Sequence, residues 1–173
     1  MEIKLTPLLI HNPFEWKRPL FYASALQREV LGTYFNHGAI LVEYPDGKKV
    51  VIEAVGHGVI ETDYKTWKDK EPKREVWSFV LKTPGDYNFL ISQKGKKYQL
   101  SVWYSYALFL LSNKLFGAES KISKFFSNIN NPDRWFCFEL MLTCFGDAEN
   151  SFRAGDYIEN NYEIIKIDLP LVD

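Results

Sequence analysis

The stretch YFNHGAILVEYPDGKKVVIEAV, residues 34–55, predicts the centre of a β-sheet. Its two halves, 34–44 and 48–55, are dominated by apolar and β-branched residues, which favour strands. The Pro-Asp-Gly sequence at 45–47 is a turn signal, because proline presets one backbone dihedral and glycine accepts a positive φ. We therefore expect a β-hairpin that turns at these three residues.

The segments on either side of this hairpin predict an α+β fold. Further strands are expected at 58–62, 74–82 and, as short pieces, 152–168. Helices are expected at 15–31, 98–114, 118–128 and 134–145. The charged segment 63–73 contains a proline and is expected at the surface. Grouping of strands apart from helices favours an antiparallel sheet packed against helices.

The length of 173 residues predicts one domain over 1–173, large enough to fold without a disulfide or metal. We expect three parts within it, which are an N-terminal helical lead-in (1–32), a core (33–145) and C-terminal short strands (146–173).

Composition excludes several classes of function. A formal net charge of −1 argues against nucleic-acid binding, and two cysteines are too few for a disulfide scaffold. No phosphate-binding loop, dinucleotide motif or zinc motif is present, so we expect no cofactor and no metal. The longest nearly apolar run, 102–111, is too short to span a bilayer. The N-terminus lacks the pattern of a signal peptide, so a cytoplasmic or particle-associated protein without stable membrane insertion is expected.

The segment RWFCFELMLTCF, residues 134–145, predicts a helix that is buried on all sides. Cys137 lies near its start, where backbone N–H groups and the helix dipole favour a thiolate. Cys144 lies two turns later and is expected in the core. Glu139 is a carboxylate on a buried helix and needs a partner. The alternative is that both cysteines are small core residues, as free cysteines commonly are.

A cysteine nucleophile needs an imidazole, and the imidazole needs an acceptor that orients it. His37 begins a predicted strand, and the small residues Gly38 and Ala39 after it would let another element approach. Glu53 is a lone carboxylate in the apolar run of the paired strand, and we expect it to be a neighbour of His37 on the adjacent strand.

The other two histidines carry weaker signals. His11 is expected at the surface. His57 lies between Gly56 and Gly58 in a predicted turn, and with His37 and Glu53 it could bind a metal by composition. The spacing of these residues matches no standard set of ligands.

The order of these motifs resembles that of the circularly permuted NlpC/P60 proteins of the papain-like superfamily. These include the bacterial YiiX-like hydrolases and, more distantly, the lecithin retinol acyltransferase relatives. The resemblance rests on Asn36-His37-Gly38-Ala39-Ile40, on Val-Ile-Glu-Ala around Glu53, on the Gly-Val of the next strand, and on Cys137-Phe138-Glu139-Leu140. It covers roughly residues 33–145.

The resemblance implies a permuted papain-like fold and a thiol hydrolase that cleaves an amide or ester, with cell-wall peptides favoured. Cys137 would be the nucleophile, His37 the base and Glu53 the residue that orients it, and Glu139 would be structural. The expected partner is a small peptide or acyl substrate, and protein partners are possible.

The sequence departs from the family pattern at two places and leaves two alternatives open. Phe138 replaces the usual serine, and Gly38-Ala39 replaces Val-Gly. With the exposed-looking Trp67 and Trp135, Phe138 motivates a catalytically silent binding or assembly domain, for example in a phage particle. An acyltransferase that uses the same thioester chemistry is the other alternative. The 16% of aromatic residues could line a substrate groove or fill the core.

Overall fold

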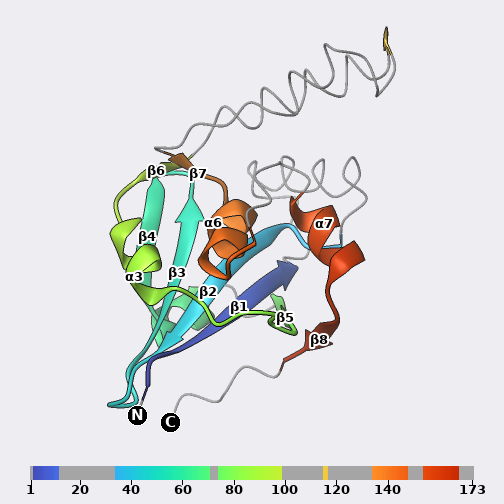
Figure 1. The fold of residues 1–173 in the computed structure, drawn as a ribbon. Coiled ribbons are helices and arrows are strands. Elements are labelled where there is room, and N and C mark those ends of the chain that lie inside the picture. Colours follow the sequence, from blue (N-terminus) through green and yellow to red (C-terminus); the bar gives the residue numbers. More distant parts are fainter. Residues whose placement is uncertain are drawn as a thin grey trace.

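A six-stranded antiparallel sheet forms the centre of the molecule (Figure 1). The computed structural model describes residues 2–11, 34–70, 74–98, 115–116, 134–147 and 154–167. The strand order is β4-β3-β2-β1-β5-β8. The strands are β1 (Lys4–His11), β2 (His37–Glu43), β3 (Lys49–Val55), β4 (Gly58–Asp63), β5 (Glu75–Phe79) and β8 (Ile164–Lys166). The protein therefore has the α+β architecture that the sequence predicts.

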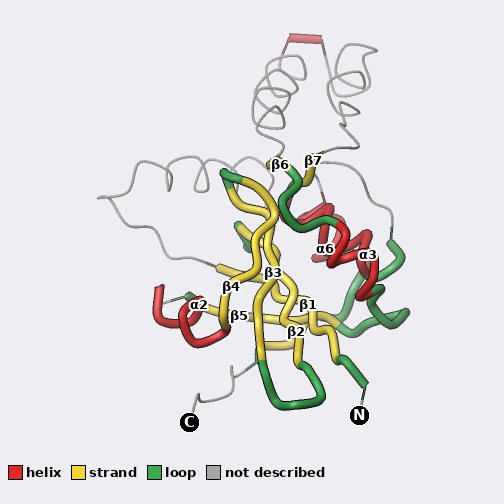
Figure 2. The backbone as a smooth tube through the Cα atoms, turned by 90° about the vertical axis from the view of Figure 1, so that its left-hand side faces the viewer, coloured by secondary structure: helices red, strands yellow, loops and turns green. Residues whose placement is uncertain are grey.

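Helices cover both faces of this sheet. Figure 2 shows α2 (Tyr64–Lys70) on one side of the sheet, and α3 (Tyr87–Ser92) and α6 (Cys137–Cys144) on the other. A fourth helix, α7 (Ala154–Asn161), packs against α6. Two short strands, β6 (Lys97–Tyr98) and β7 (Arg134–Trp135), pair in parallel next to β4.

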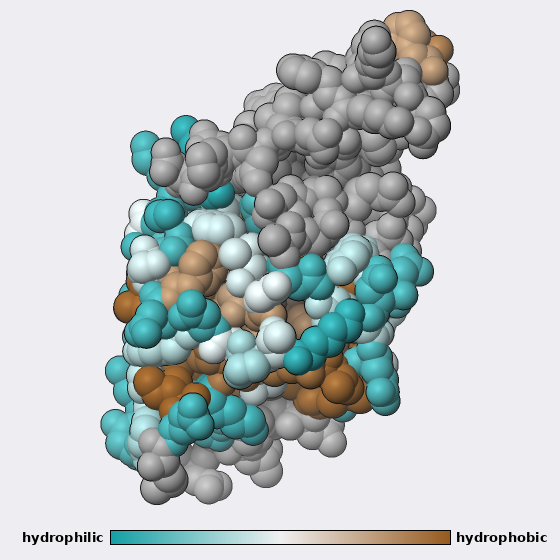
Figure 3. Space-filling model, viewed as in Figure 1, coloured by the Kyte–Doolittle hydropathy of each residue, from teal (hydrophilic) through white to brown (hydrophobic). Residues whose placement is uncertain are grey.

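Side chains that alternate along the strands build a separate apolar cluster on each face. Ile40 and Val42 of β2 pack on the α6 side, whereas Ala39 and Leu41 pack on the α2 side. The α6 side holds the larger cluster, to which α6 itself contributes buried side chains from Cys137 to Cys144. On the surface of the face seen in Figure 1, hydrophilic and hydrophobic side chains are interspersed (Figure 3).

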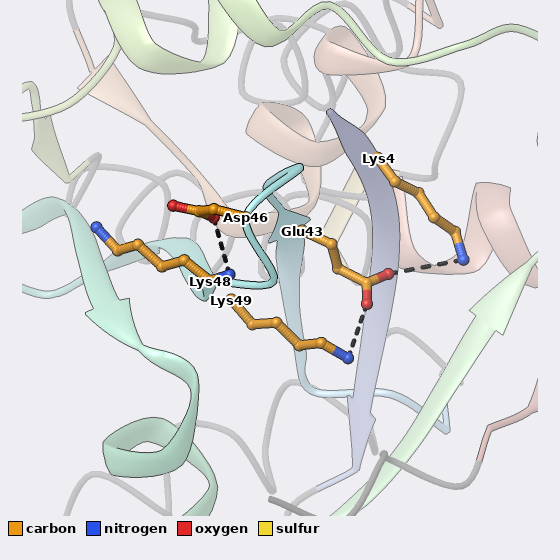
Figure 4. Close-up of polar contacts among 5 residues, drawn as sticks. All are labelled: Lys4, Glu43, Asp46, Lys48 and Lys49. Carbon is orange, nitrogen blue, oxygen red and sulfur yellow. Dashed lines mark hydrogen bonds and ion pairs between the residues drawn. The ribbon is translucent and has the colours of Figure 1, made fainter. Parts of the chain in front are cut away.

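The predicted hairpin is confirmed as β2 and β3. Val42 pairs with Val50 and Glu43 with Lys49, and Gly47 in the turn has a φ of 87°. Next to the turn, Glu43 lies between Lys49 Nζ at 2.9 Å and Lys4 Nζ at 3.6 Å, which ties the hairpin to β1 (Figure 4). The turn fixes the register, and the register decides which side chains of the two strands are neighbours.

The structure differs from the predicted N-terminal lead-in, because Lys4–His11 forms β1 rather than part of a helical segment 1–32. This strand pairs with β2 on one side and with β5 on the other. Leu8, Leu9 and Ile10 are each 0% exposed, so both faces of the strand are buried. A strand buried on both faces has no polar alternation to signal it. The predicted helix 15–31 lies outside the described residues.

Two further segments correct the prediction. The expected surface segment 63–73 contains α2, and its Trp67 is 1% exposed rather than on the surface. The helix forms because Asp63 Oδ1 accepts a hydrogen bond from the backbone N–H of Thr66 at 3.1 Å, and because Tyr64 and Trp67 share its buried face. The expected C-terminal strands include α7 before β8, because Ile158 of this helix is buried in the core.

The remaining predictions hold in part. The helix expected over 134–145 begins at Cys137, after β7, and Gly146 follows its end with a φ of 76°. Trp135 is half-buried beside Phe89, and α3 was not predicted. The helices expected at 98–114 and 118–128 lie almost wholly outside the described residues. Among the described helices, none is both long and apolar enough to cross a membrane.

Candidate active site

His37 and Glu53 meet on the α2 side of the β2–β3 hairpin. Glu53 is the register partner of Ala39, and His37 lies two residues before Ala39, so both side chains leave the same face of the sheet. The Nε2 atom of His37 lies 2.7 Å from Oε2 of Glu53. The diagonal contact is the adjacent-strand arrangement that the hairpin predicts.

Cys137 is the first residue of α6, which packs on β2 and β3. The preceding residue, Phe136, is extended, and its backbone N–H donates to Oε2 of Glu139 at 3.3 Å. Glu139 therefore finds at the helix start a partner for its buried carboxylate. The nucleophile candidate thus sits at the positive end of the helix dipole.

Gly38 lets α6 approach β2 closely. A Cβ atom at this position would lie 2.9 Å from Cδ1 of Phe138 and 3.4 Å from the carbonyl oxygen of Cys137. The residue next to His37 is therefore in contact with the residue next to Cys137. The small neighbours of His37 allow the approach of the cysteine helix that the sequence suggests.

Replacement of Gly38 by alanine tests this contact. Phe138 is 1% exposed and packed among other core residues, so it cannot shift at little cost. We expect Gly38→Ala to lower the free energy of unfolding by about 1–3 kcal/mol, as overpacking does. Gly56→Ala is the matched control, because a Cβ there has nothing within 4 Å and the residue does not need a positive φ. Urea denaturation of both variants measures the effect, and equal midpoints would contradict it.

The imidazole of His37 lies between two groups that both favour its protonated form. Burial lowers the pKa of His37, but the charge of Cys137, a hydrogen bond to the Cys137 side chain and the contact with Glu53 together raise it to about 10. Nε2 of the ring is the nitrogen that faces Glu53. The side chain of His37 is 19% exposed, so one edge of the group still reaches the surface.

We expect the His37 ring to stay doubly protonated at pH 8, as ¹H–¹⁵N NMR of the ring would detect. Because its pKa in the fold exceeds the ordinary 6.5, the stability that its charge contributes is complete below about pH 6.5 and is lost as pH rises through about 10. In Cys137→Ala the pKa should fall, since the charge of Cys137 is the largest influence that raises it. Titration of wild-type His37 near 6.5 would contradict this assignment.

Glu53 remains ionised although it is only 8% exposed. Burial raises the pKa of its carboxyl group, but the hydrogen bond and charge of His37, the indole of Trp67 and the charge of Arg74 outweigh burial and lower it. The Nε1–H of Trp67 acts on this carboxylate from a distance or angle that falls short of hydrogen-bonding geometry. The acceptor that faces His37 is therefore a carboxylate rather than a neutral acid.

The other titratable candidates lie elsewhere. Cys144 is buried, burial raises its pKa to about 12, and its sulfur faces the carbonyl of Asp86 at 3.6 Å, so it is a core residue as predicted. His11 stacks on Tyr34 and contacts its carbonyl oxygen at 2.8 Å through Nδ1. His57 is exposed in the β3–β4 turn. Within the described residues, no three His, Cys, Asp or Glu side chains are arranged to hold a metal ion.

Two residues of this neighbourhood escape the sequence pattern, namely Trp67 and Arg74. The signal that could have found Trp67 is its spacing of three residues from Tyr64, which places both aromatic rings on one face of a helix.

Comparison of the chain with models of protein families, with curated proteins and with solved structures found no match.

Proposed function

We propose that this chain is a thiol hydrolase of amide or ester bonds, in which Cys137 is the nucleophile, His37 the general base and acid, and Glu53 the residue that orients His37. One observation carries the proposal. The single imidazole of His37 contacts Glu53 at 2.7 Å through Nε2, and the Cys137 side chain is near enough to raise the pKa of the same ring. This chain of nucleophile, base and acceptor is what activation of a thiol requires.

Before the first half of the reaction, the proton of the Cys137 thiol already rests on His37, and the thiolate attacks the acyl carbon. The carbonyl oxygen becomes an oxyanion, and the N–H groups at the start of α6 are the donors closest to the sulfur along the chain. When the intermediate collapses, His37 returns its proton to the leaving amine or alcohol. A thioester on Cys137 remains.

In the second half, water replaces the leaving group. His37 takes one proton from the water molecule, and the hydroxide attacks the thioester carbon. Collapse expels the Cys137 thiolate and releases a carboxylic acid, so the sulfur and the imidazole return to their starting state. Glu53 keeps its charge throughout and stabilises the imidazolium that forms in both halves.

The substrate class that we propose is a cell-wall peptide, on the strength of the resemblance to the permuted NlpC/P60 proteins, whose papain-like fold we also propose for this chain. Half-buried Trp135 and Tyr98 and buried Phe136 lie close to the nucleophile and support binding of a partly apolar acyl group. With a particle-associated or cytoplasmic location, such a protein would meet its substrate through lysis or delivery.

One observation favours the second candidate, a catalytically silent binding domain. Cys137 is 3% exposed, and the ring of Phe138 fills the space next to Gly38. An acyltransferase would share every step up to the thioester and differ only in the acceptor that resolves it. The products therefore separate it from a hydrolase.

The test is capture of the thioester. We expect incubation with a panel of acyl esters and peptidoglycan-derived peptides to add the acyl mass to Cys137, and we expect water to remove it as free acid. Intact-mass spectrometry with peptide mapping locates the adduct. Absence of any adduct across the panel, with the thiol reduced, would favour the binding domain, and transfer to an added amine or alcohol in preference to water would indicate an acyltransferase.

A further inference from the structure

Behind Glu53, on the side away from Cys137, an aromatic ring and a cation come together from two other elements. Trp67 of α2 is 1% exposed and belongs to the cluster that contains Ala39 and Val51. Glu53 leaves the same face of the sheet, because it pairs with Ala39. The ring of Trp67 and the carboxylate therefore lie on the same face of the sheet.

Arg74, the residue before β5, places its guanidinium carbon 4.1 Å from the centre of the Trp67 ring. Stacking of this kind orients both groups, since the planar guanidinium lies against the face of the indole. The Nε1–H of Trp67 is buried and meets no acceptor in hydrogen-bonding geometry, which for a buried donor is costly.

We propose that Trp67 and Arg74 act together as positioning residues, which keep Glu53 ionised and turned towards His37. This inference rests on the proposed function. Positioning residues are needed here because a buried carboxylate without such support would take up a proton and could no longer stabilise the imidazolium. The indole lies on the same face of the sheet as the carboxylate, and the guanidinium stacked on the indole adds a positive charge to that side.

The influences that lower the pKa of Glu53 come from three elements, which are His37 from β2, Trp67 from α2 and Arg74 next to β5. Burial and the charge of Glu43 raise the pKa of Tyr64 in α2, and Glu61 of β4 pairs with Lys94 at 2.7 Å. Removal of Trp67 Nε1 or of the Arg74 charge should therefore raise the pKa of the Glu53 carboxyl group.

The test compares Trp67→Phe, Arg74→Gln and Arg74→Lys with a control at a second tryptophan. Trp77 also has a buried Nε1 without a partner and a lysine, Lys166, 5.4 Å from its ring centre. It lies in β5 opposite Leu9 and Lys166, where it acts on Glu75 rather than Glu53. Trp77→Phe therefore removes a buried indole N–H next to a cation at a site that acts on Glu75 rather than on Glu53.

The readout is the pH at which the Glu53 carboxyl group titrates, followed by ¹³C NMR. We expect Trp67→Phe and Arg74→Gln to move this titration to higher pH by about one unit, which is the lower end of the range for loss of a nearby opposite charge. Arg74→Lys should titrate close to the wild-type protein, and Trp77→Phe should leave the titration unchanged.

These results separate the inference from the proposed function. The carboxyl titration does not require that any substrate be hydrolysed. An unchanged Glu53 titration in both Trp67→Phe and Arg74→Gln would overturn the role of these residues even in an active hydrolase. A shifted titration in a protein that forms no acyl adduct would support the inference and remove only the hydrolase.

Discussion

Cys137→Ala is expected to abolish hydrolysis of any ester or peptide that the wild-type protein cleaves. The substitution removes the sulfur that forms the thioester and leaves His37 with Glu53 alone. Loss of a catalytic nucleophile lowers kcat by about three to six orders of magnitude, and the remainder reflects binding and oxyanion stabilisation. Product formation measured with a chromogenic acyl ester and with a peptidoglycan fragment would show the loss.

The chain contains its own matched control for this experiment. Cys144 lies on the same helix and is also buried, but its sulfur faces the carbonyl of Asp86 rather than an imidazole. Since burial raises the pKa of Cys144 to about 12, iodoacetamide at neutral pH should modify Cys137 and spare Cys144. Cys144→Ala should retain activity and lose some stability from the vacated core volume. Equal activity of Cys137→Ala and wild type would remove the catalytic assignment.

Local patterns explain why the hairpin and the placement of His37, Glu53 and Cys137 on their elements could be predicted. The Pro-Asp-Gly turn and the strands around it place His37 near Glu53 through a contact between neighbours in sequence. The position of Cys137 at a helix start also follows from nearby residues, although the cap is Phe136 rather than the polar cluster before it. The predictable part of the site is therefore the set of contacts that elements adjacent in sequence determine.

The features that escaped prediction depend on tertiary packing. β1 is buried on both faces, so its run of apolar residues carries no period of two. In α2, charged residues surround Tyr64 and Trp67, and burial of the two rings rather than propensity decides where the helix lies. The approach of Trp67 and Arg74 to Glu53 joins three segments that are separate in sequence. No pattern within any one of these segments specifies such a contact.

Glu53→Gln should reduce kcat/KM by about two to four orders of magnitude, as neutralising the orienting carboxylate of a catalytic imidazole does. The amide keeps the shape of the side chain but loses the charge that stabilises protonated His37. The pKa of His37 should fall, because both the hydrogen bond and the charge of Glu53 raise it. The alkaline limb of the activity profile should move to lower pH, and NMR of the His37 ring should show the same displacement.

On the acid side, the stability that Glu53 contributes is lost as pH falls, whereas the stability that protonated His37 contributes is lost as pH rises. In the wild-type protein the pKa of Glu53 is lowered, so its contribution to stability is present above its ordinary pKa of 4.5 and is lost as pH falls through the folded value. Glu53→Gln removes this acid-dependent loss. Glu43→Gln is the control, since the pKa of Glu43 is also lowered, by Lys49, but the residue lies at the far end of β2 in a surface ion pair. Activity that falls equally in both variants would mean that charge on the hairpin, rather than the contact with His37, matters to the reaction.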